Sequence, residues 1–171
     1  MINPSITDVK ALSIPMKKVL VFGTFDILHP GHLYFLREAK KHGEHLTVVV
    51  TPASVVKKLK GKAPMFGEAH RVATVKLMSF VDRVVLGDRT LSSFTILKKY
   101  KPGVICFGYD QGTLAKYVEA YYKKSSLKGL LFERSREPTF IRLKPYNQQK
   151  HKSERLKKLL SGEEVCLRCR I

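Results

Sequence analysis

Short, unbroken apolar segments alternate with segments of helical periodicity along most of this chain. The apolar segments lack the polar alternation of a half-exposed strand, so we predict strands that are buried on both faces of a sheet. Helices between consecutive strands imply parallel pairing through right-handed crossovers. The pattern therefore predicts an α/β fold with a single doubly wound, Rossmann-like parallel sheet of about five strands, in the order 3-2-1-4-5, and helices on both faces.

The expected elements place one domain over residues 17–160, between a disordered leader (1–16) and a flexible tail (161–171). Predicted strands cover residues 18–22, 46–51, 83–87, 103–108 and an apolar stretch within 127–133. Predicted helices cover residues 32–42, 70–80, 92–100, 113–124 and 152–160. We expect residues 52–68 to form a basic connection, because glycine and proline punctuate that segment. Met16 is an alternative start for translation.

Strand order predicts where a ligand binds. In doubly wound sheets the ligand lies outside the carboxyl ends of the strands, where the strand order reverses. In the predicted order this reversal lies between the first and fourth strands. The first strand is followed by GTFDILHPGH (Gly23–His32), and the fourth ends in GYDQ (Gly108–Gln111). We therefore expect these two unusual loops to face one crevice.

The first of these loops has the chemistry of an anion site. Gly23 lets the chain leave the strand tightly, Pro30 fixes φ, and Gly31 leaves the backbone open to a ligand. His32 begins the predicted helix, whose free N–H groups and positive dipole end attract phosphate. His29 and His32 can project to the same side of the turn, each with an N–H for a phosphate oxygen. The alternative is that both are ordinary turn and capping residues.

The chain is strongly basic, with a formal net charge of +18. Such a charge attracts nucleotides, phosphorylated metabolites, nucleic acid or an anionic membrane surface, and alone it does not separate these partners. No apolar segment approaches the roughly 18 to 20 residues that cross a bilayer. The first residues lack the basic and apolar regions of a signal peptide. We therefore expect a cytoplasmic protein without a membrane partner.

Cysteine usage does not predict a disulfide framework or a metal site within the chain. The total is three, which is odd, and no secretion signal accompanies it. Cys106 lies in the apolar run VICF and is expected to be buried in a strand. Cys166 and Cys169 form one C-x-x-C pair, which is half of a zinc site. Either this pair is incidental or redox-sensitive, or it binds metal across a homodimer.

GTFDILHPGH resembles the H-x-G-H loop of the nucleotidyltransferase superfamily, which includes cytidylyltransferases and several adenylyltransferases. KLKGKAP, HRVATVKLMSFVDRVVLGD and VICFGYDQ resemble the superfamily's basic segment, its Arg-headed helix and its strand-four loop. The similarity covers most of residues 17–160. The combination with GYDQ is most similar to archaeal-type FAD synthases. The glycerol-3-phosphate cytidylyltransferase branch usually carries an RTEGIST-like segment, where this chain has RLKPYNQQKHKSERL.

This resemblance implies transfer of AMP from ATP to the phosphate of an acceptor, FMN, with release of pyrophosphate. The reaction needs positioning and charge neutralisation rather than a nucleophilic side chain. Mg²⁺ is expected to arrive mainly with the nucleoside triphosphate. One alternative is cytidylyl transfer from CTP to glycerol-3-phosphate. Another is a catalytically weak fold that binds nucleotides or nucleic acid, which the basic charge would suit.

The resemblance also implies catalytic roles for particular residues. His29 and His32 would hold the α- and β-phosphates and stabilise charge on the reacting phosphorus. Lys60 would bring a cation over the phosphates, with Lys57 and Lys58 as competing candidates. Arg71 would clamp a phosphate, or else it is an ordinary surface arginine.

Further residues would bind the nucleotide. Thr24 and Phe25 would line its site together with Pro30 and Gly31. Asp110 would recognise ribose or base or help to hold Mg²⁺, with helix capping as its alternative role. Tyr146 would line the pocket, and Ser153 would offer helix N–H groups to phosphate. Glu154 replaces the second hydroxyl of the superfamily's second motif and places an anion near the triphosphate.

A flavin acceptor would require an apolar, aromatic slot. Met65 and Phe66 are candidates for that slot, together with Phe140 and Tyr146. Packing in the core is the alternative role for these side chains.

Overall fold

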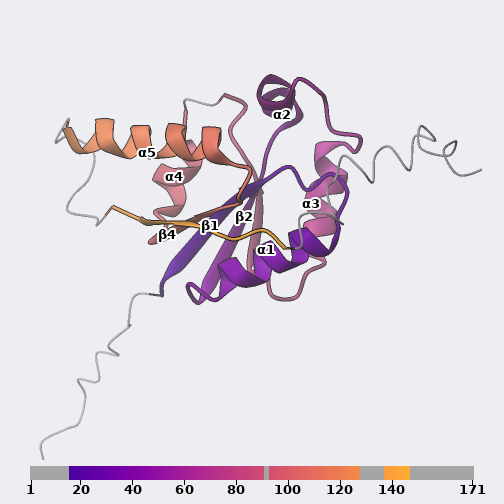
Figure 1. The fold of residues 1–171 in the computed structure, drawn as a ribbon, viewed down its shortest axis with the longest axis horizontal. Coiled ribbons are helices and arrows are strands. Elements are labelled where there is room, and N and C mark those ends of the chain that lie inside the picture. The colour runs from indigo at the N-terminus through magenta and orange to yellow at the C-terminus, as the bar shows by residue number, and fades with distance from the viewer. Residues whose placement is uncertain (1–15, 91–92, 128–136, 147–171) are drawn as a thin grey trace, which may run out of the picture.

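A computed structural model describes residues 16–90, 93–127 and 137–146 of the chain (Figure 1). The described strands are β1 (Lys18–Gly23), β2 (His45–Val50), β3 (Arg83–Leu86), β4 (Val104–Phe107) and β5 (Thr139–Arg142). The described helices are α1 (Pro30–Lys40), α2 (Ala53–Lys60), α3 (Glu68–Lys76), α4 (Thr95–Tyr100) and α5 (Gly112–Leu127). The strands form one parallel sheet in the order β3-β2-β1-β4-β5, which confirms the predicted topology.

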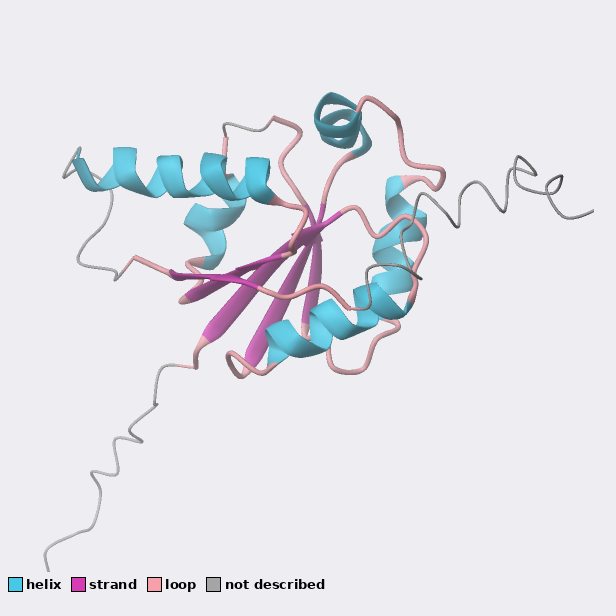
Figure 2. Ribbon diagram, viewed as in Figure 1, coloured by secondary structure: helices cyan, strands magenta, loops and turns pink. Residues whose placement is uncertain are grey.

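Helices cover both faces of this sheet (Figure 2). One apolar cluster joins alternate residues of β1, β2 and β4 to Leu36 of α1 and Val75 of α3. The other cluster joins the opposite faces of those strands to Leu97 of α4 and Val118 of α5. β4 is buried along its whole length because helices cover both faces of the sheet. This burial explains why the sequence of β4 shows no polar alternation. None of the described helices is long and apolar enough to span a bilayer.

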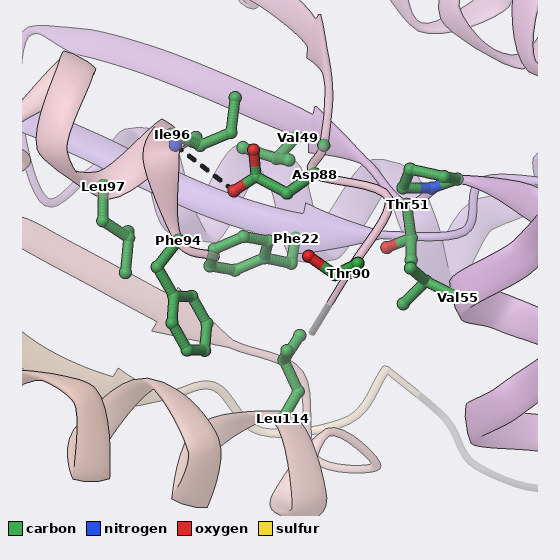
Figure 3. Close-up of a pocket in the computed structure, with 12 residues that line it drawn as sticks. Phe22, Val49, Thr51, Val55, Asp88, Thr90, Phe94, Ile96, Leu97 and Leu114 are labelled. Atoms are coloured by element: carbon green, nitrogen blue, oxygen red, sulfur yellow. Dashed lines mark hydrogen bonds between the residues drawn. The ribbon is translucent and has the colours of Figure 1, made fainter. Parts of the chain in front are cut away.

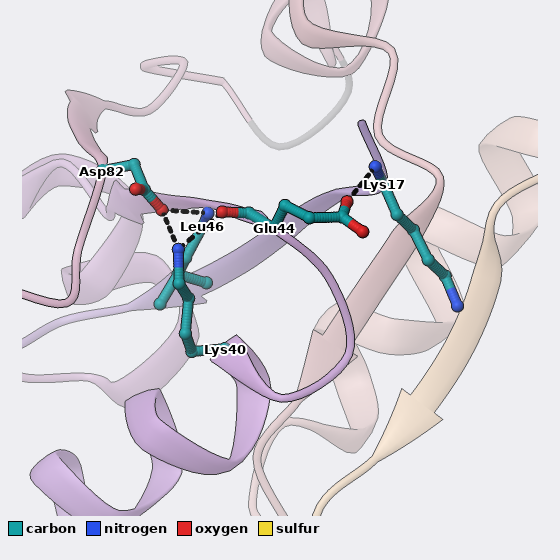
Figure 4. A network of polar contacts seen from close by, with 5 residues as sticks. All are labelled: Lys17, Lys40, Glu44, Leu46 and Asp82. Atoms are coloured by element: carbon teal, nitrogen blue, oxygen red, sulfur yellow. Dashed lines mark hydrogen bonds and ion pairs between the residues drawn. The ribbon is translucent and has the colours of Figure 1, made fainter. Parts of the chain in front are cut away.

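A polar network closes the end of the sheet where β2 and β3 begin (Figure 4). The Asp82 carboxylate accepts hydrogen bonds from Lys40 Nζ at 2.5 Å and from the Leu46 N–H at 2.6 Å. Lys40 Nζ also donates to the Glu44 carbonyl at 2.6 Å. Burial acts to raise the pKa of Asp82, but these two donors and nearby positive charge together lower it. The carboxyl ends of the strands, at the other end of the sheet, remain for a ligand.

The prediction for the fifth strand is wrong in position. The strand that pairs with β4 is β5, Thr139–Arg142, rather than a segment within 127–133. Of that segment, residues 128–133 lie outside the described residues, and Leu127 ends α5. β5 lies at the edge of the sheet, where the two end residues are exposed and the middle two half-buried. A short edge strand lacks the continuous apolar run that marks a central strand.

Several helices also differ from their predicted extents. α3 covers Glu68–Lys76 rather than residues 70–80, and α4 begins at Thr95 rather than at residue 92. α2 occupies part of the segment expected to be a connection, and α1 begins at Pro30 rather than His32. The Glu68 carboxylate accepts a hydrogen bond from the Ala53 N–H at 2.9 Å at the start of α2, and Gly61 ends that helix at φ 72°. The first contact is distant in sequence, so local periodicity does not reveal it.

Candidate active site

The chain leaves β1 through a tight turn built on Gly23 and Phe25. Phe25 adopts a left-handed φ of 48°, which is uncommon for a bulky residue, and its side chain is buried. A Cβ atom added to Gly23 would lie 2.3 Å from the Phe25 ring, so only glycine leaves room for that ring. The Phe25 ring centroid lies 5.3 Å from that of His32. The turn therefore packs directly against one of the two histidines.

His29 caps α1. Its backbone is extended, and its Nδ1 accepts a hydrogen bond from the Gly31 N–H at 3.1 Å. Pro30 follows at the first helical position, where the missing N–H costs nothing. Because Nδ1 accepts this bond, the proton of the neutral His29 ring lies on Nε2. Capping therefore uses Nδ1, whereas the phosphate binding weighed as its alternative would use the N–H of Nε2.

His32 stacks on His29, with 3.9 Å between the ring centroids and 30° between the ring planes. Burial, together with the positive charges of His29 and Lys60, lowers the pKa of His32 to about 3. A backbone hydrogen bond to Ile27 acts in the opposite direction. His32 Nδ1 is buried and has no hydrogen-bond partner among the described residues. The site thus holds a neutral imidazole with a polar atom that a ligand can satisfy.

Arg71 of α3 is completely buried, so the alternative of a surface arginine is wrong. Its Nη1 donates to the carbonyls of Thr24 at 2.7 Å and Thr51 at 2.9 Å, and its Nε donates to Phe66 at 3.1 Å. These carbonyls follow β1, follow β2 and precede α3. Burial lowers the pKa of Arg71, and Asp26 partly offsets that effect. Nη2 is buried without a partner among the described residues.

Asp26 is a residue of the loop that the sequence did not single out. Its buried carboxylate accepts hydrogen bonds from the backbone N–H groups of Met65 and Phe66, both at 2.8 Å. These bonds hold the connection between α2 and α3 over the loop after β1. The Met65 and Phe66 side chains remain 50% and 37% exposed, which contradicts core packing for them. The signal for Asp26 in the sequence was an acidic residue next to the aromatic Phe25 in the loop after the first strand.

Gln111 ties the β4 loop to the end of β1. Its Oε1 accepts from the Gly108 N–H at 3.0 Å, and its Nε2 donates to the Phe22 carbonyl at 2.8 Å. The two loops that the sequence placed at one crevice are therefore joined by a single side chain. Asp110 is exposed, and its Oδ1 lies 3.1 Å from where a Cβ on Gly108 would stand. Sequence reasoning quoted Gln111 only within GYDQ and gave it no role.

The remaining candidates lie around this centre. Lys60 is exposed at the end of α2, and its effect on His32 places it within electrostatic reach of the histidines. Tyr146 follows β5 and is 44% exposed, with its ring centroid 5.2 Å from that of Tyr34 on α1. Phe140 instead packs in the core beside Phe107. The predicted residues Ser153 and Glu154 lie outside the described residues.

Fold and site together define a Rossmann-like protein with a candidate anion site where the carboxyl ends of β1 and β4 meet. The site combines a helix N-terminus, two stacked imidazoles and a nearby lysine, all suited to phosphate oxygens. A family model described as cytidylyltransferase-like matches residues 20–159. The chain belongs to this cytidylyltransferase-like family of nucleotidyltransferases.

Similar proteins include curated archaeal FAD synthases. The chain is 36% identical to that of Methanoregula boonei over 140 residues, which cover 82% of this chain and 86% of the relative. It is 42% identical to that of Aciduliprofundum boonei over 113 residues, covering 66% and 74% respectively. A solved structure is also similar: a lipopolysaccharide core biosynthesis protein from Thermoplasma volcanium, with a TM-score of 0.64 and 34% identity. That match covers 77% of this chain and 99% of the other.

Proposed function

We propose that this protein is an FMN adenylyltransferase. It joins the phosphate of FMN to the α-phosphorus of ATP, releases pyrophosphate and yields FAD. The observation that carries the proposal is the stacked pair His29 and His32 at the start of α1, at the reversal of strand order. The FAD synthase relatives support FMN as the acceptor, since one of them aligns with 82% of the chain.

The two histidines act on the triphosphate. The N-terminus of α1 supplies free N–H groups and a positive dipole end for phosphate oxygens. His29 donates from Nε2 while its Nδ1 keeps the helix capped. His32 stays neutral at physiological pH and therefore binds through hydrogen bonding rather than as a cation. Both rings are in place before reaction, so stabilising the developing charge requires little reorganisation.

The acceptor phosphate oxygen attacks the α-phosphorus in line, and the bond to the pyrophosphate oxygen breaks. Lys60, which is exposed at the end of α2, contributes a positive charge to the leaving pyrophosphate. Arg71 is a positioning residue, because its three backbone contacts fix the loops around the reacting groups. Its Nη2, which is buried without a partner among the described residues, is one further donor.

Mg²⁺ would enter with the triphosphate and neutralise part of its charge. The described residues contain no group of three or more His, Cys, Asp or Glu side chains placed to hold a metal ion. Asp26 already accepts two backbone hydrogen bonds. Asp110, which is exposed on the β4 loop, is therefore the carboxylate of these two loops that best suits a shared ion.

The decisive experiment combines nucleotide and acceptor choices in one assay. Purified protein and Mg²⁺ are incubated with ATP or CTP, each against FMN or glycerol-3-phosphate. Pyrophosphate release and the nucleotide product are measured, with the His29→Ala variant as a control for contaminating activity. FAD from ATP and FMN supports the proposal. A CDP-linked product would instead identify a cytidylyltransferase, and no product from any pair would contradict nucleotidyl transfer to these acceptors.

A further inference from the structure

A recess lies beside the end of β1, on the face of the sheet covered by α4 and α5 (Figure 3). The recess is open to solvent, and its empty volume is about 430 Å³ when the open mouth is included. The apolar part of its wall includes Phe22, Val49, Phe94 and Leu114. Asp88 supplies the one charged side chain among its lining residues. The mechanism above assigns none of these side chains a role.

Backbone contacts connect this recess to the nucleotide site. Phe22 immediately precedes Gly23, and its carbonyl is the one that Gln111 holds from the β4 loop. Thr51, another lining residue, donates its N–H to the Gly23 carbonyl at 2.8 Å. The Thr51 carbonyl in turn accepts from Arg71. A ligand in the recess would therefore contact Phe22 and Thr51, which are directly joined to the turn that leads to His29 and His32.

The aromatic walls are fixed by the core behind them. The Phe22 ring is nearly parallel to the Phe107 ring, at an angle of 10° with 6.5 Å between the centroids. The Phe94 ring packs at 4.9 Å from Tyr121 of α5. Such a preformed, largely apolar cavity suits a flat ring system better than a small hydrophilic alcohol.

Asp88 favours a ligand that places a hydrogen-bond donor at one side of the recess. Its carboxylate accepts from the Thr95 hydroxyl and, at 3.4 Å, from the Ile96 N–H. A carboxylate has about four lone-pair sites, so two such donors leave it able to accept another hydrogen bond. The preferred ligand is thus flat and mostly apolar, with an N–H at one edge.

We propose that this recess holds the isoalloxazine ring of the flavin acceptor, with Asp88 accepting the hydrogen bond of the ring imide N–H. The inference rests on the proposed function, because it names the place where that acceptor binds. The ribityl chain then runs over the turn at Gly23 toward His29 and His32. In this proposal the recess, rather than the pair Met65 and Phe66, is the slot that holds the ring.

The test uses lumiflavin, which carries the ring without the ribityl phosphate. Its dissociation constant is measured by flavin fluorescence for the wild-type chain, Leu114→Glu and the matched control Leu77→Glu. Leu77 is 85% exposed and does not line the recess. We expect Leu114→Glu to weaken lumiflavin binding at least about tenfold, because it places a charge against the ring. We expect Leu77→Glu to bind like the wild type.

A second variant preserves the shape of the site if Leu114→Glu does not fold. Asp88→Asn should weaken lumiflavin binding roughly tenfold through loss of a charge-assisted hydrogen bond. Lumiflavin methylated at the imide nitrogen should bind the wild type about tenfold more weakly than lumiflavin, and Asp88→Asn should barely distinguish the two. Absence of lumiflavin binding to the wild type, or equal binding by all variants, would overturn the inference.

Turnover separates this inference from the proposed function. If the wild type produces FAD but folded Leu114→Glu has an unchanged KM for FMN, the proposed activity stands. The recess is then not the site that binds FMN. Failure of the wild type to make FAD would refute the activity, whereas the lumiflavin titration still tests the recess. The proposed activity and the flavin site in the recess are both supported if Leu114→Glu has a raised KM for FMN and a nearly unchanged KM for ATP.

Discussion

The imidazole rings of His29 and His32 stack at the start of α1, with their centroids 3.9 Å apart. Residues three apart on a helical turn lie on one face, which brings the two rings together. His29 is fixed by its capping bond to Gly31, and His32 packs against Phe25. The fold itself therefore positions the pair, before any substrate binds.

Loss of either ring should remove most of the activity without unfolding the chain. We expect His29→Ala and His32→Ala to lower kcat at least about a hundredfold, because a lost charge-stabilising donor costs about 3–4 kcal/mol in the transition state. Pyrophosphate release measures the rate, and circular dichroism measures the folding. His42→Ala, at the other end of the helix, is the matched control.

His29→Asn separates the two functions of that ring. Asparagine is a good N-cap, so this variant should keep the stability that His29→Ala loses, about 1 kcal/mol. It lacks the imidazole, and we expect its turnover to stay as low as that of His29→Ala. Turnover near the wild-type value in any of the folded variants at these two positions would refute the assigned role.

The low pKa of His32 predicts a pH dependence of stability. The folded chain keeps this ring neutral down to about pH 3, whereas the unfolded chain protonates it near 6.5. The unfolded state therefore binds more protons between these values, so the free energy of unfolding falls as the pH falls through this window. The slope is at most about 1.4 kcal/mol per pH unit from this group.

Urea unfolding at pH 7 and pH 5 measures this effect. The wild type should lose roughly 1–2 kcal/mol more stability between the two values than His32→Gln, which cannot titrate there. An identical pH dependence in the two proteins would show that His32 is not the group responsible.

Strand order and the crevice were predictable because both depend on patterns local in sequence. The apolar runs of β1, β2 and β4 indicate central strands, and the crossover rule then leaves few topologies. This order places the loops after β1 and β4 together, as Gln111 confirms. The edge strand β5 was missed, because it is short and its end residues are exposed, so it gives no continuous apolar signal.

The contacts within the site were not predictable, because they join residues distant in sequence. Arg71 heads a helix as the pattern suggested, yet its burial depends on carbonyls contributed by three separate segments. Asp26 holds a connection about forty residues further along, and no periodicity encodes that pairing. Side-chain bonds to loop backbone depend on the assembled fold.

Arg71→Met should destabilise the chain and reduce activity together. Methionine fills a similar volume but leaves the carbonyls of Thr24, Thr51 and Phe66 without their donor. We expect a loss of about 3 kcal/mol or more in the free energy of unfolding, measured with urea. The control Arg89→Met, at an exposed position, should leave the free energy of unfolding almost unchanged. Arg71→Lys should recover little, because an ammonium cannot reproduce the planar fork of donors.

Asp26→Asn and Asp82→Asn should differ in their effect on catalysis. Each carboxylate accepts two hydrogen bonds, so each amide variant should lose roughly 1–2 kcal/mol of stability, with Asp82 at the lower end because it is partly exposed. Asp26 borders the site, whereas Asp82 lies at the opposite end of the sheet. We therefore expect kcat/KM to fall at least about tenfold only in Asp26→Asn, measured at a temperature where both are folded. Equal rates in the two variants would contradict a positioning role for Asp26.

Gln111→Glu should loosen the crevice with little change in shape. A glutamate can still accept from the Gly108 N–H, but it cannot donate to the Phe22 carbonyl and places two acceptors face to face. Because this bridge joins the β1 and β4 loops that flank the nucleotide, we expect the KM for ATP to rise about tenfold or more. Steady-state kinetics at varied ATP measure this, with Glu119→Gln on α5, away from the bridge, as the reciprocal change. A KM for ATP equal to that of the wild type would mean that the bridge has no part in nucleotide binding.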